Sequence, residues 1–399
     1  MPPSQQIRMA KVEKERNNES RKLSFYVHVP YCVKRCGYCD FNTYTPSELN
    51  SPDLKGITTS YIDSALKEIE LASGKLGKIQ VETIFFGGGT PSLLPAQEVS
   101  RVIAKISALF EIRPNAEITL EANPDTITES FLDSIRESGV NRISIGMQSA
   151  VPHVLNTLDR THNPDNVVKS CELARKLGFE HLSVDLIYGI PGESFQDWQR
   201  SFEAALQLPI DHISAYALIV ETGTKLAAQI KRGELLMPAD DETAEKYLQF
   251  DAAATSLGFN WYELSNWAIP GAESLHNKAY WNGSSWWGVG PGAHSFIEGR
   301  RWWNVKHPRK YQELISQNRS PEQDSEVLSL ENMRDEFVML RIRTREGIPL
   351  ERLTDKQLEI ANQFKNSGYI ESLTWRDSLL VLTAKGRLIA DRIVRELLV

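Results

Sequence analysis

Six short runs rich in β-branched and aromatic residues recur along the first half of the chain, with helix-like segments between them. The runs are SFYVHV (24–29), ETIFFG (82–87), EITLEA (117–122), RISIGM (142–147), HLSVDLI (181–187) and HISAYAL (212–218). Strands that alternate with helices are typical of parallel βαβ units, and their crossovers are right-handed. We therefore predict an α/β fold, with a partial (β/α)6 barrel of the TIM type over residues 23–220.

The residues that stand out chemically fall at or just past the C-terminal ends of these runs. They are Pro30–Cys32, Gly87–Thr90, Glu121, Gln148, Asp185 and Tyr216. The C-terminal rim of a (β/α) barrel is where active sites are built. The sequence therefore predicts one site at this rim, assembled from successive strands.

The pattern changes after residue 220. Residues 221–328 are rich in Trp, Gly and Asn and have weaker periodicity, so we expect a mixed second region there. Residues 329–399 are expected to form two helices, a hairpin over YIESLTWRDSLLVLT that turns at Arg376–Asp377, and a closing helix capped by Thr383. This order predicts a small winged-helix-like domain, and such a fold by itself does not imply DNA binding.

Composition excludes several classes of protein. The chain has 41% hydrophobic and 24% charged residues, as ordinary globular proteins do. Its net charge of −7 argues against a general nucleic-acid binder, because such proteins usually present a basic face. Residues 1–22 mix both charge signs and lack the apolar core of a secretory signal, so we interpret them as a mobile N-terminal arm. With only four cysteines, the chain is expected to be cytoplasmic with reduced thiols.

Three of the four cysteines stand within eight residues, in the stretch CVKRCGYCDF. A Cys-x3-Cys-x2-Cys loop suits thiolate ligation of a [4Fe–4S] cluster, and three ligands leave one iron open. Structural zinc usually needs four ligands, commonly in two pairs, whereas Cys171 lies alone in a helical pattern and is expected to be a core residue. A disulfide would leave one thiol over. We therefore interpret Cys32, Cys36 and Cys39 as cluster ligands.

The stretches YVHVPYCVKRCGYCDF (26–41) and FFGGGTPS (85–92) resemble the radical S-adenosylmethionine (SAM) enzymes, and among them the family around oxygen-independent coproporphyrinogen III oxidase. The resemblance is close from residue 24 to about 220 and looser over most of the rest. In that family, three cysteines hold a [4Fe–4S] cluster whose open iron binds the amino and carboxylate groups of SAM. Reductive cleavage then gives a 5′-deoxyadenosyl radical. The resemblance implies the same cluster and SAM here.

The resemblance also implies contacts with SAM along the predicted rim. Gly88 and Gly89 would let polar groups of the ligand approach bare backbone, and Thr90 adds a hydroxyl, although a glycine triplet alone is more often a turn. Glu121 could bond ribose hydroxyls, although a lone strand-end Glu is usually a solvated charge. Arg160 suits a carboxylate. The other positions that match the SAM site of the family are Tyr26, near SAM, Tyr38, against the adenine, Gln148 and Asp185.

Two differences separate this chain from the oxidase itself. The oxidase has a fourth cysteine two positions after the third, where this chain has Phe41, and it has a longer arm than the 31 residues before Cys32. The CDF form resembles a sister group of haem chaperones, and HNKAYW (276–281) matches the H-N-x-x-Y-W signature of that group. His276 could supply imidazole to haem iron, and Tyr280 and Trp281 could pack against a porphyrin face. From the residues alone, a hydrogen-bonded turn on a core is the favoured interpretation, and the family match shifts the balance to haem ligation.

The glycines of WWGVGPGAHS (286–295) lack the strand-then-helix context of a nucleotide loop, so we expect a turn with close backbone approach. His294 is a second candidate for the haem or the pocket. Trp302 and Trp303 are expected to be packing residues.

We therefore expect a radical SAM haem chaperone that binds haem, a [4Fe–4S] cluster and SAM and delivers haem to haem proteins, chiefly respiratory ones. The alternative is an oxygen-independent coproporphyrinogen III oxidase. A plain electron carrier would not require six polar positions at strand ends. Whether the chain cleaves SAM as an enzyme stays open. A homodimer and transient membrane contact are compatible with the delivery of haem, and no nucleic-acid partner is expected.

Overall fold

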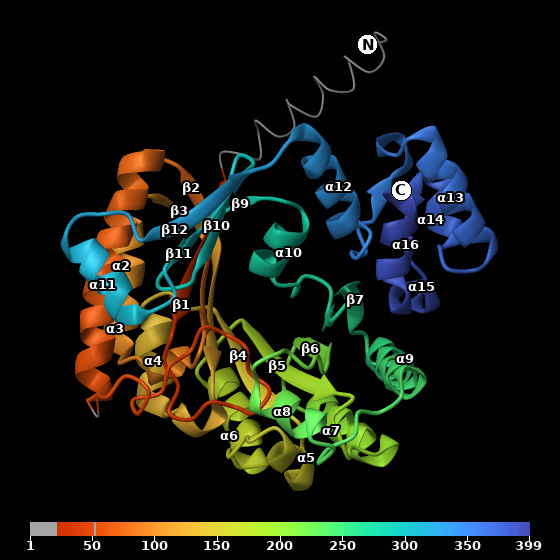
Figure 1. Ribbon diagram of the computed structural model, residues 1–399. Helices are drawn as coiled ribbons and strands as arrows, with labels where there is room; N and C mark the ends of the chain where they lie inside the picture. Colours follow the sequence, from red (N-terminus) through yellow and green to blue (C-terminus); the bar gives the residue numbers. More distant parts are fainter. Residues whose placement is uncertain (1–21, 52) are drawn as a thin grey trace.

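A computed structural model of the chain describes residues 22–51 and 53–399; apart from Lys22, the predicted N-terminal arm lies outside these residues. Six strands form the centre of a 12-stranded sheet and lie in chain order. Neighbouring strands among the six pair in parallel. The prediction of an α/β partial barrel is confirmed (Figure 1). The strands are β1 (Lys22–Val29), β2 (Gln80–Gly88), β3 (Glu111–Ala122), β4 (Arg142–Gln148), β5 (His181–Tyr188) and β6 (His212–Ala217).

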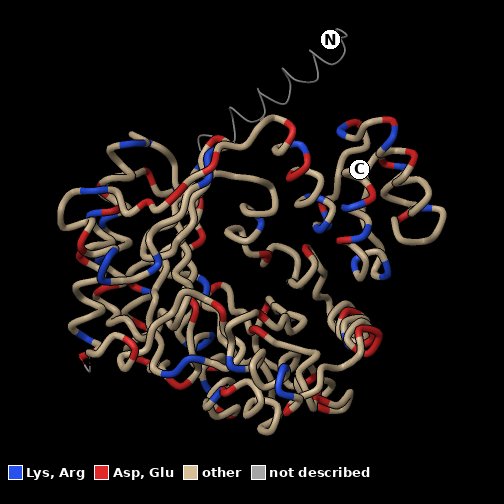
Figure 2. Tube along the Cα trace, in the orientation of Figure 1, with Lys and Arg blue, Asp and Glu red and all other residues tan. Residues whose placement is uncertain are grey.

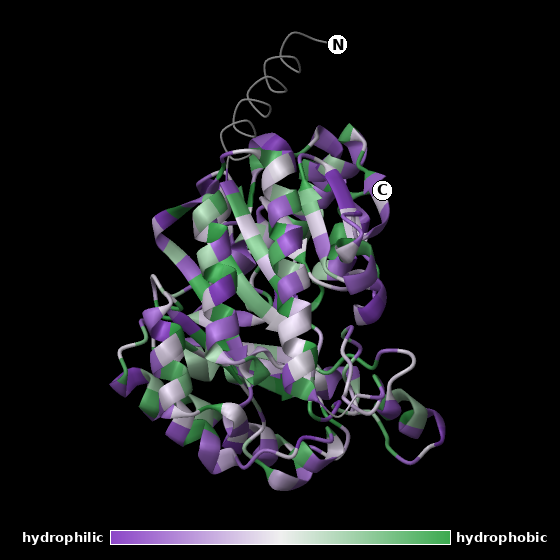
Figure 3. Ribbon diagram, turned by 90° about the vertical axis from the view of Figure 1, so that its left-hand side faces the viewer, coloured by the Kyte–Doolittle hydropathy of each residue, from purple (hydrophilic) through white to green (hydrophobic). Residues whose placement is uncertain are grey.

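Helices connect successive strands and cover the outer face of the sheet (Figure 1). Their sequences explain why they do so. The helix that follows β2 buries four aliphatic residues at helical spacing, Val99, Val102, Ile103 and Ile106. This apolar stripe faces the sheet, and the opposite side of the helix faces water. Hydrophilic and hydrophobic residues accordingly alternate along the outer helices (Figure 3). The helices are α2 (Leu54–Leu76), α3 (Ala96–Leu109), α4 (Glu129–Glu137), α5 (Pro152–Thr157), α6 (Pro164–Lys176) and α7 (Phe195–Leu206).

The region after residue 220 extends the same sheet at both edges. At one edge, β9 (Ser285–Val289) pairs in parallel with β1, and β10 (His294–Ile297), β11 (Arg300–Asn304) and β12 (Glu322–Val327) follow in antiparallel order. At the other edge, β8 (Asn266–Ala268) and β7 (Asn260–Glu263) continue from β6. The helices of this region are α8 (Lys225–Lys231), α9 (Asp240–Ser256), α10 (Leu275–Trp281) and α11 (Pro308–Ser316).

The C-terminal segment has its own hydrophobic core, which includes Val338, Ile342, Phe364 and Ile393. In Figure 1 it forms a separate lobe beside the barrel. Acidic and basic residues are interspersed along it (Figure 2). Its elements are α12 (Leu330–Arg341), β13 (Ile348–Pro349), α13 (Asp355–Asn366), α14 (Ser372–Arg376), β14 (Leu379–Leu380), α15 (Ala384–Leu388) and α16 (Ala390–Leu397).

The predicted hairpin in this lobe is wrong over most of its length. The short helix α14 occupies the segment, β14 pairs with β13, and a single antiparallel bridge joins Ile370 to Leu382. The helical turn brings Trp375 back toward α13, where the Lys365 ammonium lies 4.9 Å from its ring centre. The predicted cap is confirmed, because the Thr383 side chain accepts the Gly386 N–H.

No helix within residues 22–51 and 53–399 has the length and apolar character that crossing a membrane requires.

Candidate functional site

The cysteine loop leaves the C-terminal end of β1 and is closed at its base by backbone pairing. Cys32 N–H donates to Tyr44 O at 3.1 Å, and Tyr44 N–H donates to Pro30 O at 2.7 Å. Farther along the loop, Cys39 N–H donates to Cys36 O at 3.3 Å. The two ends of the loop therefore lie side by side at the C-terminal rim of the barrel.

Asn42 fastens this loop to the second region of the chain. Its Nδ2 donates to Pro291 O at 2.9 Å and to Lys306 O at 2.8 Å. The backbone carbonyl oxygen of Asn42 lies 2.9 Å from Nε2 of His28 on β1. These bonds tie the segment after Cys39 to β1, to the turn before β10 and to the segment after β11. No local pattern marks Asn42, because the residues that accept its hydrogen bonds lie 249 and 264 positions later in the chain.

The three cysteines of the loop are free, partly exposed, and line one cavity. The Thr90 hydroxyl lies 3.7 Å from the Cys32 Sγ, and Nη1 of Arg160 lies 3.7 Å from the Cys36 Sγ. Burial raises the pKa of the Cys39 thiol to about 11. Soft thiolate ligands suit an iron–sulfur cluster, and the Arg160 guanidinium supplies a positive charge beside them.

In the described part of the chain, no three His, Cys, Asp or Glu side chains are placed to hold a single metal ion. The predicted core residue Cys171 is fully buried in α6, away from the loop.

The close approach of two backbone segments requires glycine at positions 88 and 89. Gly89 N–H donates to Val29 O at 2.7 Å, and Thr90 N–H donates to Tyr31 O at 2.8 Å, so the end of β2 runs directly against the base of the cysteine loop. A Cβ at Gly88, where φ is +110°, would lie 2.6 Å from the His28 ring, and one at Gly89 would lie 2.5 Å from Tyr31 O. The glycines therefore allow this close crossing, in addition to lining the cavity.

Two partly buried carboxylates, Glu121 and Asp185, face the cavity from β3 and β5. The Gly88 N–H donates to Oε2 of Glu121 at 3.1 Å, and the Ser144 hydroxyl lies 3.1 Å from Oδ1 of Asp185. Burial raises the pKa of Glu121 to about 8, and the charge of Asp185 adds to this effect. Burial also raises the pKa of Asp185 to about 6. Near pH 7 the Glu121 carboxyl therefore holds a proton, and a ligand that donates hydrogen bonds through hydroxyl or ammonium groups would stabilise the ionised form of both side chains.

The remaining residues predicted for the SAM site also line the cavity. Gln148 ends β4 in a left-handed conformation with φ of +61°, beside a register shift in the β4–β5 pairing. Nη2 of Arg160 donates to Gly146 O at 2.7 Å, while its buried Nε has no partner among the described atoms. The Tyr26 hydroxyl lies 3.0 Å from Nδ1 of His28. Tyr38 packs against a small apolar cluster of the α5 region. The structure therefore brings the whole predicted set together.

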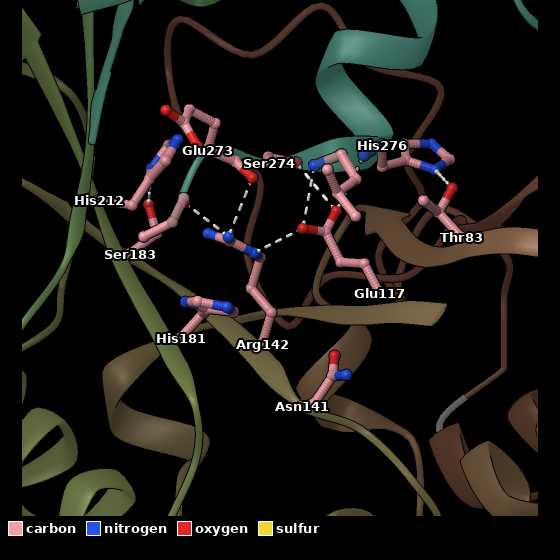
Figure 4. Close-up of polar contacts among 12 residues, drawn as sticks. Thr83, Glu117, Asn141, Arg142, His181, Ser183, His212, Glu273, Ser274 and His276 are labelled. Carbon is pink, nitrogen blue, oxygen red and sulfur yellow. Dashed lines mark hydrogen bonds and ion pairs between the residues drawn. The ribbon is translucent and has the colours of Figure 1, made fainter. Parts of the chain in front are cut away.

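His276 enters the same cavity from α10 on the opposite side. Its ring is 2% exposed and lies 4.9 Å, centre to centre, from Phe85. Nδ1 lies 2.7 Å from the Thr83 hydroxyl and Nε2 lies 3.0 Å from the Tyr280 hydroxyl (Figure 4 shows the Thr83 contact). Burial lowers the pKa of His276 to about 3, so the imidazole is neutral near pH 7. The motif forms the predicted hydrogen-bonded turn as well, because Ser274 caps α10 by accepting Asn277 N–H.

A buried ion pair inside the barrel holds the start of α10 (Figure 4). Nε of Arg142 lies 2.9 Å from Oε2 of Glu117, and Nη2 donates to Ala272 O at 2.7 Å. Glu117 in turn accepts the N–H of Leu275 at 3.0 Å and of His276 at 2.9 Å. This ion pair was not predicted from the sequence, although Glu117 and Arg142 are charged residues in otherwise apolar strands, which was an available signal.

The cavity has a volume of about 720 Å³ and joins the cysteine loop, the carboxylates and His276 in one space. Val33, Phe41 and Ile219 line it and are 66%, 61% and 70% exposed, so its mouth has apolar side chains in contact with solvent.

His294 is not among the lining residues of this cavity and instead stacks on Trp303 at 5.7 Å. Trp302 packs against Trp287, as predicted. The predicted close turn is confirmed, because a Cβ at Gly290 would lie 2.7 Å from His28 O.

Comparison with known proteins now assigns the family. The family model of the radical SAM superfamily matches residues 26–205. The haem chaperone HemW of Mycobacterium tuberculosis is 46% identical over 375 residues, which cover 94% of this chain and 94% of that protein. This chain belongs to the HemW family. The Bacillus subtilis HemW is 31% identical and is matched over 97% of its length.

The HemW fold is shared with a solved enzyme. Coproporphyrinogen III oxidase (HemN) from Escherichia coli superimposes with a TM-score of 0.79 over 95% of this chain and 90% of that one, at 21% identity. At this identity the likeness shows the fold alone. Membership of the radical SAM superfamily implies a [4Fe–4S] cluster and SAM as cofactors. The thiols and polar side chains that face one cavity fit these two cofactors.

Proposed function

We propose that this chain is a haem chaperone that holds haem through His276 and delivers it to haem proteins. The observation that carries the proposal is the neutral, buried imidazole of His276, which lines the same cavity as the three cysteines. Neutral imidazole is the form that ligates haem iron. The names of the HemW relatives support the same assignment.

In this proposal Cys32, Cys36 and Cys39 ligate the [4Fe–4S] cluster. The cluster and SAM together supply electron transfer and, where SAM is cleaved, radical chemistry. Arg160 lies beside the Cys36 Sγ and offsets part of the negative charge of the thiolates. Its guanidinium lines the cavity and would pair with the SAM carboxylate.

The other cavity residues would contact the remaining parts of SAM. Glu121 would accept the ribose hydroxyls, and Asp185, Gln148 and Tyr26 would complete the polar wall. Tyr38 would lie against the adenine, with Gly88, Gly89 and Thr90 lining the opposite side. Buried carboxylates with raised pKa values gain stabilisation when a ligand donates hydrogen bonds to them, which favours this arrangement.

Haem would enter and leave by the apolar mouth of the cavity. Exposed side chains such as Phe41, Val33 and Ile219 can cover porphyrin surface during passage. Phe41 occupies the position at which oxygen-independent coproporphyrinogen III oxidase has its fourth cysteine. The proposal includes a cytoplasmic location, acceptors that are chiefly respiratory haem proteins, transient membrane contact during delivery, and a homodimer as one assembly state.

Haem transfer to an acceptor tests the proposal. Cluster-reconstituted protein loaded with one equivalent of haem is mixed with an apo-cytochrome, and the spectrum of the holo-cytochrome is followed with time. The expected result is transfer that is lost when His276→Ala protein is used. Transfer no different from that given by free haem would contradict the chaperone assignment.

An assay of the alternative uses the same preparation. Coproporphyrinogen III, SAM and a reductant are supplied under anaerobic conditions, and the products are separated by chromatography. We expect no protoporphyrinogen. Its formation at many turnovers per chain would assign the chain as an oxidase.

A further inference from the structure

Four side chains from three separate elements form one hydrogen-bonded row that ends in the cavity. The Thr83 hydroxyl of β2 donates to the Ser24 Oγ of β1 at 2.8 Å. The same Thr83 oxygen lies 2.7 Å from Nδ1 of His276, and the other ring nitrogen lies 3.0 Å from the Tyr280 hydroxyl. Ser24, Thr83 and His276 are 3%, 1% and 2% exposed. Water therefore has little access to the inner three members of the row.

The row determines which nitrogen of His276 carries the proton. A threonine hydroxyl has one hydrogen, and the hydrogen of Thr83 is directed to Ser24. The bond between Thr83 and the imidazole must then run from Nδ1–H to the Thr83 oxygen. A neutral imidazole has one N–H, so Nε2 is left with a lone pair, which accepts the hydrogen of the Tyr280 hydroxyl. The Tyr280 hydroxyl keeps its hydrogen, because burial and the nearby Glu121 carboxylate raise its pKa.

We propose that Thr83 prepares His276 as an iron ligand and that Tyr280 is a latch on the ligating nitrogen. Thr83 holds the tautomer in which Nε2 bears the lone pair, and the Tyr280 hydroxyl occupies that lone pair until haem iron replaces it. The inference rests on the proposed function, because it concerns the haem ligand of that site. It assigns Thr83 as a positioning residue and Tyr280 as the group that must leave.

The geometry of α10 allows this replacement. Tyr280 follows His276 by four residues, so the two rings lie on one face of the same helix, 4.9 Å apart and nearly perpendicular. Tyr280 lies in the last turn of α10 and packs edge-on against Trp286 at 4.8 Å. Rotation of its side chain would uncover Nε2 without movement of His276, whose backbone N–H is held by Glu117.

The first test reads the tautomer in the haem-free protein. Full-length protein is labelled with 15N-histidine, and His276→Ala protein identifies the signals of His276. We expect a protonated Nδ1 and an unprotonated Nε2. In Tyr280→Phe protein, the Nε2 signal is expected to shift further toward a nitrogen without a hydrogen-bond partner. A protonated Nε2 would overturn the inference whether or not the protein binds haem.

The second test measures haem dissociation constants from the Soret band. Tyr280→Phe keeps the ring and removes the hydroxyl, so we expect roughly 2- to 10-fold tighter binding, as for loss of one competing hydrogen bond. Thr83→Val removes the acceptor of Nδ1–H, so we expect binding weaker by about 10- to 100-fold and a lower Fe–His stretching frequency in the ferrous complex. Thr83→Ser keeps the hydroxyl and is expected to restore both values.

The outcomes separate the two proposals. If His276→Ala binds haem as the wild type does, His276 is not the ligand, and both the proposed haem site and the latch are overturned. If His276→Ala loses binding while Tyr280→Phe binds no tighter than the wild type, the latch alone is overturned. Thermal unfolding of each variant shows that the comparison is made between folded proteins.

Discussion

In the ligand-free protein, partial removal from water destabilises the ionised forms of Glu121 and Asp185. Each carboxylate lies in the wall of the cavity, partly shielded from water, with one backbone N–H as the hydrogen-bond partner of Glu121 and serine hydroxyls as those of Asp185. Water solvates a carboxylate far better than so few donors do, so burial raises both pKa values. A bound ligand that donates further hydrogen bonds would reverse this effect. The two residues therefore indicate a binding site for a polar ligand.

The raised pKa of Glu121 predicts how stability depends on pH. Its value is about 8 in the folded protein and about 4.3 in an unfolded chain. Between these values the folded state holds a proton that the unfolded state has lost, so the free energy of unfolding falls as pH rises. Glu121→Gln removes this contribution, and its free energy of unfolding should fall less, by a few kcal/mol, between pH 5 and pH 9.

Urea denaturation of cluster-free protein at several pH values provides the measurement. Glu70→Gln, which alters an exposed carboxylate on α2, serves as the matched control and should keep the wild-type slope. An unchanged slope in Glu121→Gln would show that this carboxylate is solvated in the ligand-free protein.

The sequence predicted the residues of the rim because they lie at or near the C-terminal ends of strands, where chain order alone places them. It did not predict Thr83, Glu117 or Arg142, which lie within strands and face the interior of the barrel. Their roles depend on α10, which begins more than 150 residues after Glu117 and reaches them only in the folded chain. Asn42 was missed for the same reason. Local patterns cannot report such contacts.

At the scale of elements, α10 is a short helix whose start is held by a charge inside the barrel. Its first N–H groups donate to Glu117, which is paired with Arg142. A carboxylate at a helix start satisfies unpaired N–H groups and suits the helix dipole. The position of the His276 ring thus depends on an ion pair between β3 and β4.

Removal of Glu117 should therefore be costly. Glu117→Ala leaves the Arg142 charge buried without its partner, and we expect a loss of about 3–5 kcal/mol in the free energy of unfolding, together with weaker haem binding. Asp63→Asn breaks the exposed pair with Arg101 and should cost less than about 1 kcal/mol. Denaturant unfolding and Soret titration check both. Equal small losses in the two variants would contradict a clamping role for Glu117.

The cysteine loop depends in the same way on a distant element. Asn42→Ala removes one hydrogen bond to the turn before β10 and one to the segment after β11, so the segment after Cys39 should become more mobile. We expect the reconstituted cluster to be lost severalfold faster to an iron chelator, as followed by its visible absorbance. Asn156→Ala, an exposed change on α5, is the control. Identical loss rates in Asn42→Ala and wild-type protein would show that the loop is held by its own backbone pairing alone.

The elements themselves were predictable to different degrees. β1–β6 and the helices between them follow from local periodicity, and their order follows from parallel crossovers. That β9 joins β1, and β8 joins β6, could not be predicted, because these pairings connect segments far apart in sequence. α14 stands in place of the expected hairpin and places Trp375 near Lys365 of α13, a tertiary contact that the local pattern of the segment does not report.

At the scale of the whole molecule, the proposed cofactor and haem sites share one cavity. The Tyr26 ring lies 6.4 Å from the His276 ring, and the Glu121 carboxylate is close enough to raise the pKa of Tyr280. SAM and haem would therefore meet inside about 720 Å³. Two ligands that compete for one space weaken each other's binding. Thermodynamic linkage requires that each ligand raises the dissociation constant of the other by the same factor.

This arrangement predicts that SAM promotes haem release. The haem dissociation constant of the cluster-reconstituted protein should rise severalfold at saturating SAM. The SAM dissociation constant should rise by the same factor at saturating haem. Soret titrations and equilibrium dialysis with labelled SAM give the two factors. Independent binding of the two ligands would contradict the shared cavity.

The most direct test of the account is an anaerobic haem titration of the cluster-reconstituted protein, followed at the Soret band, with His276→Ala and His294→Ala beside the wild type. His294 is the matched control, because it is a histidine that does not line the cavity. The account predicts saturation near one haem per chain for wild type and His294→Ala, and binding lost or weakened at least tenfold in His276→Ala. Equal binding by all three proteins would contradict it.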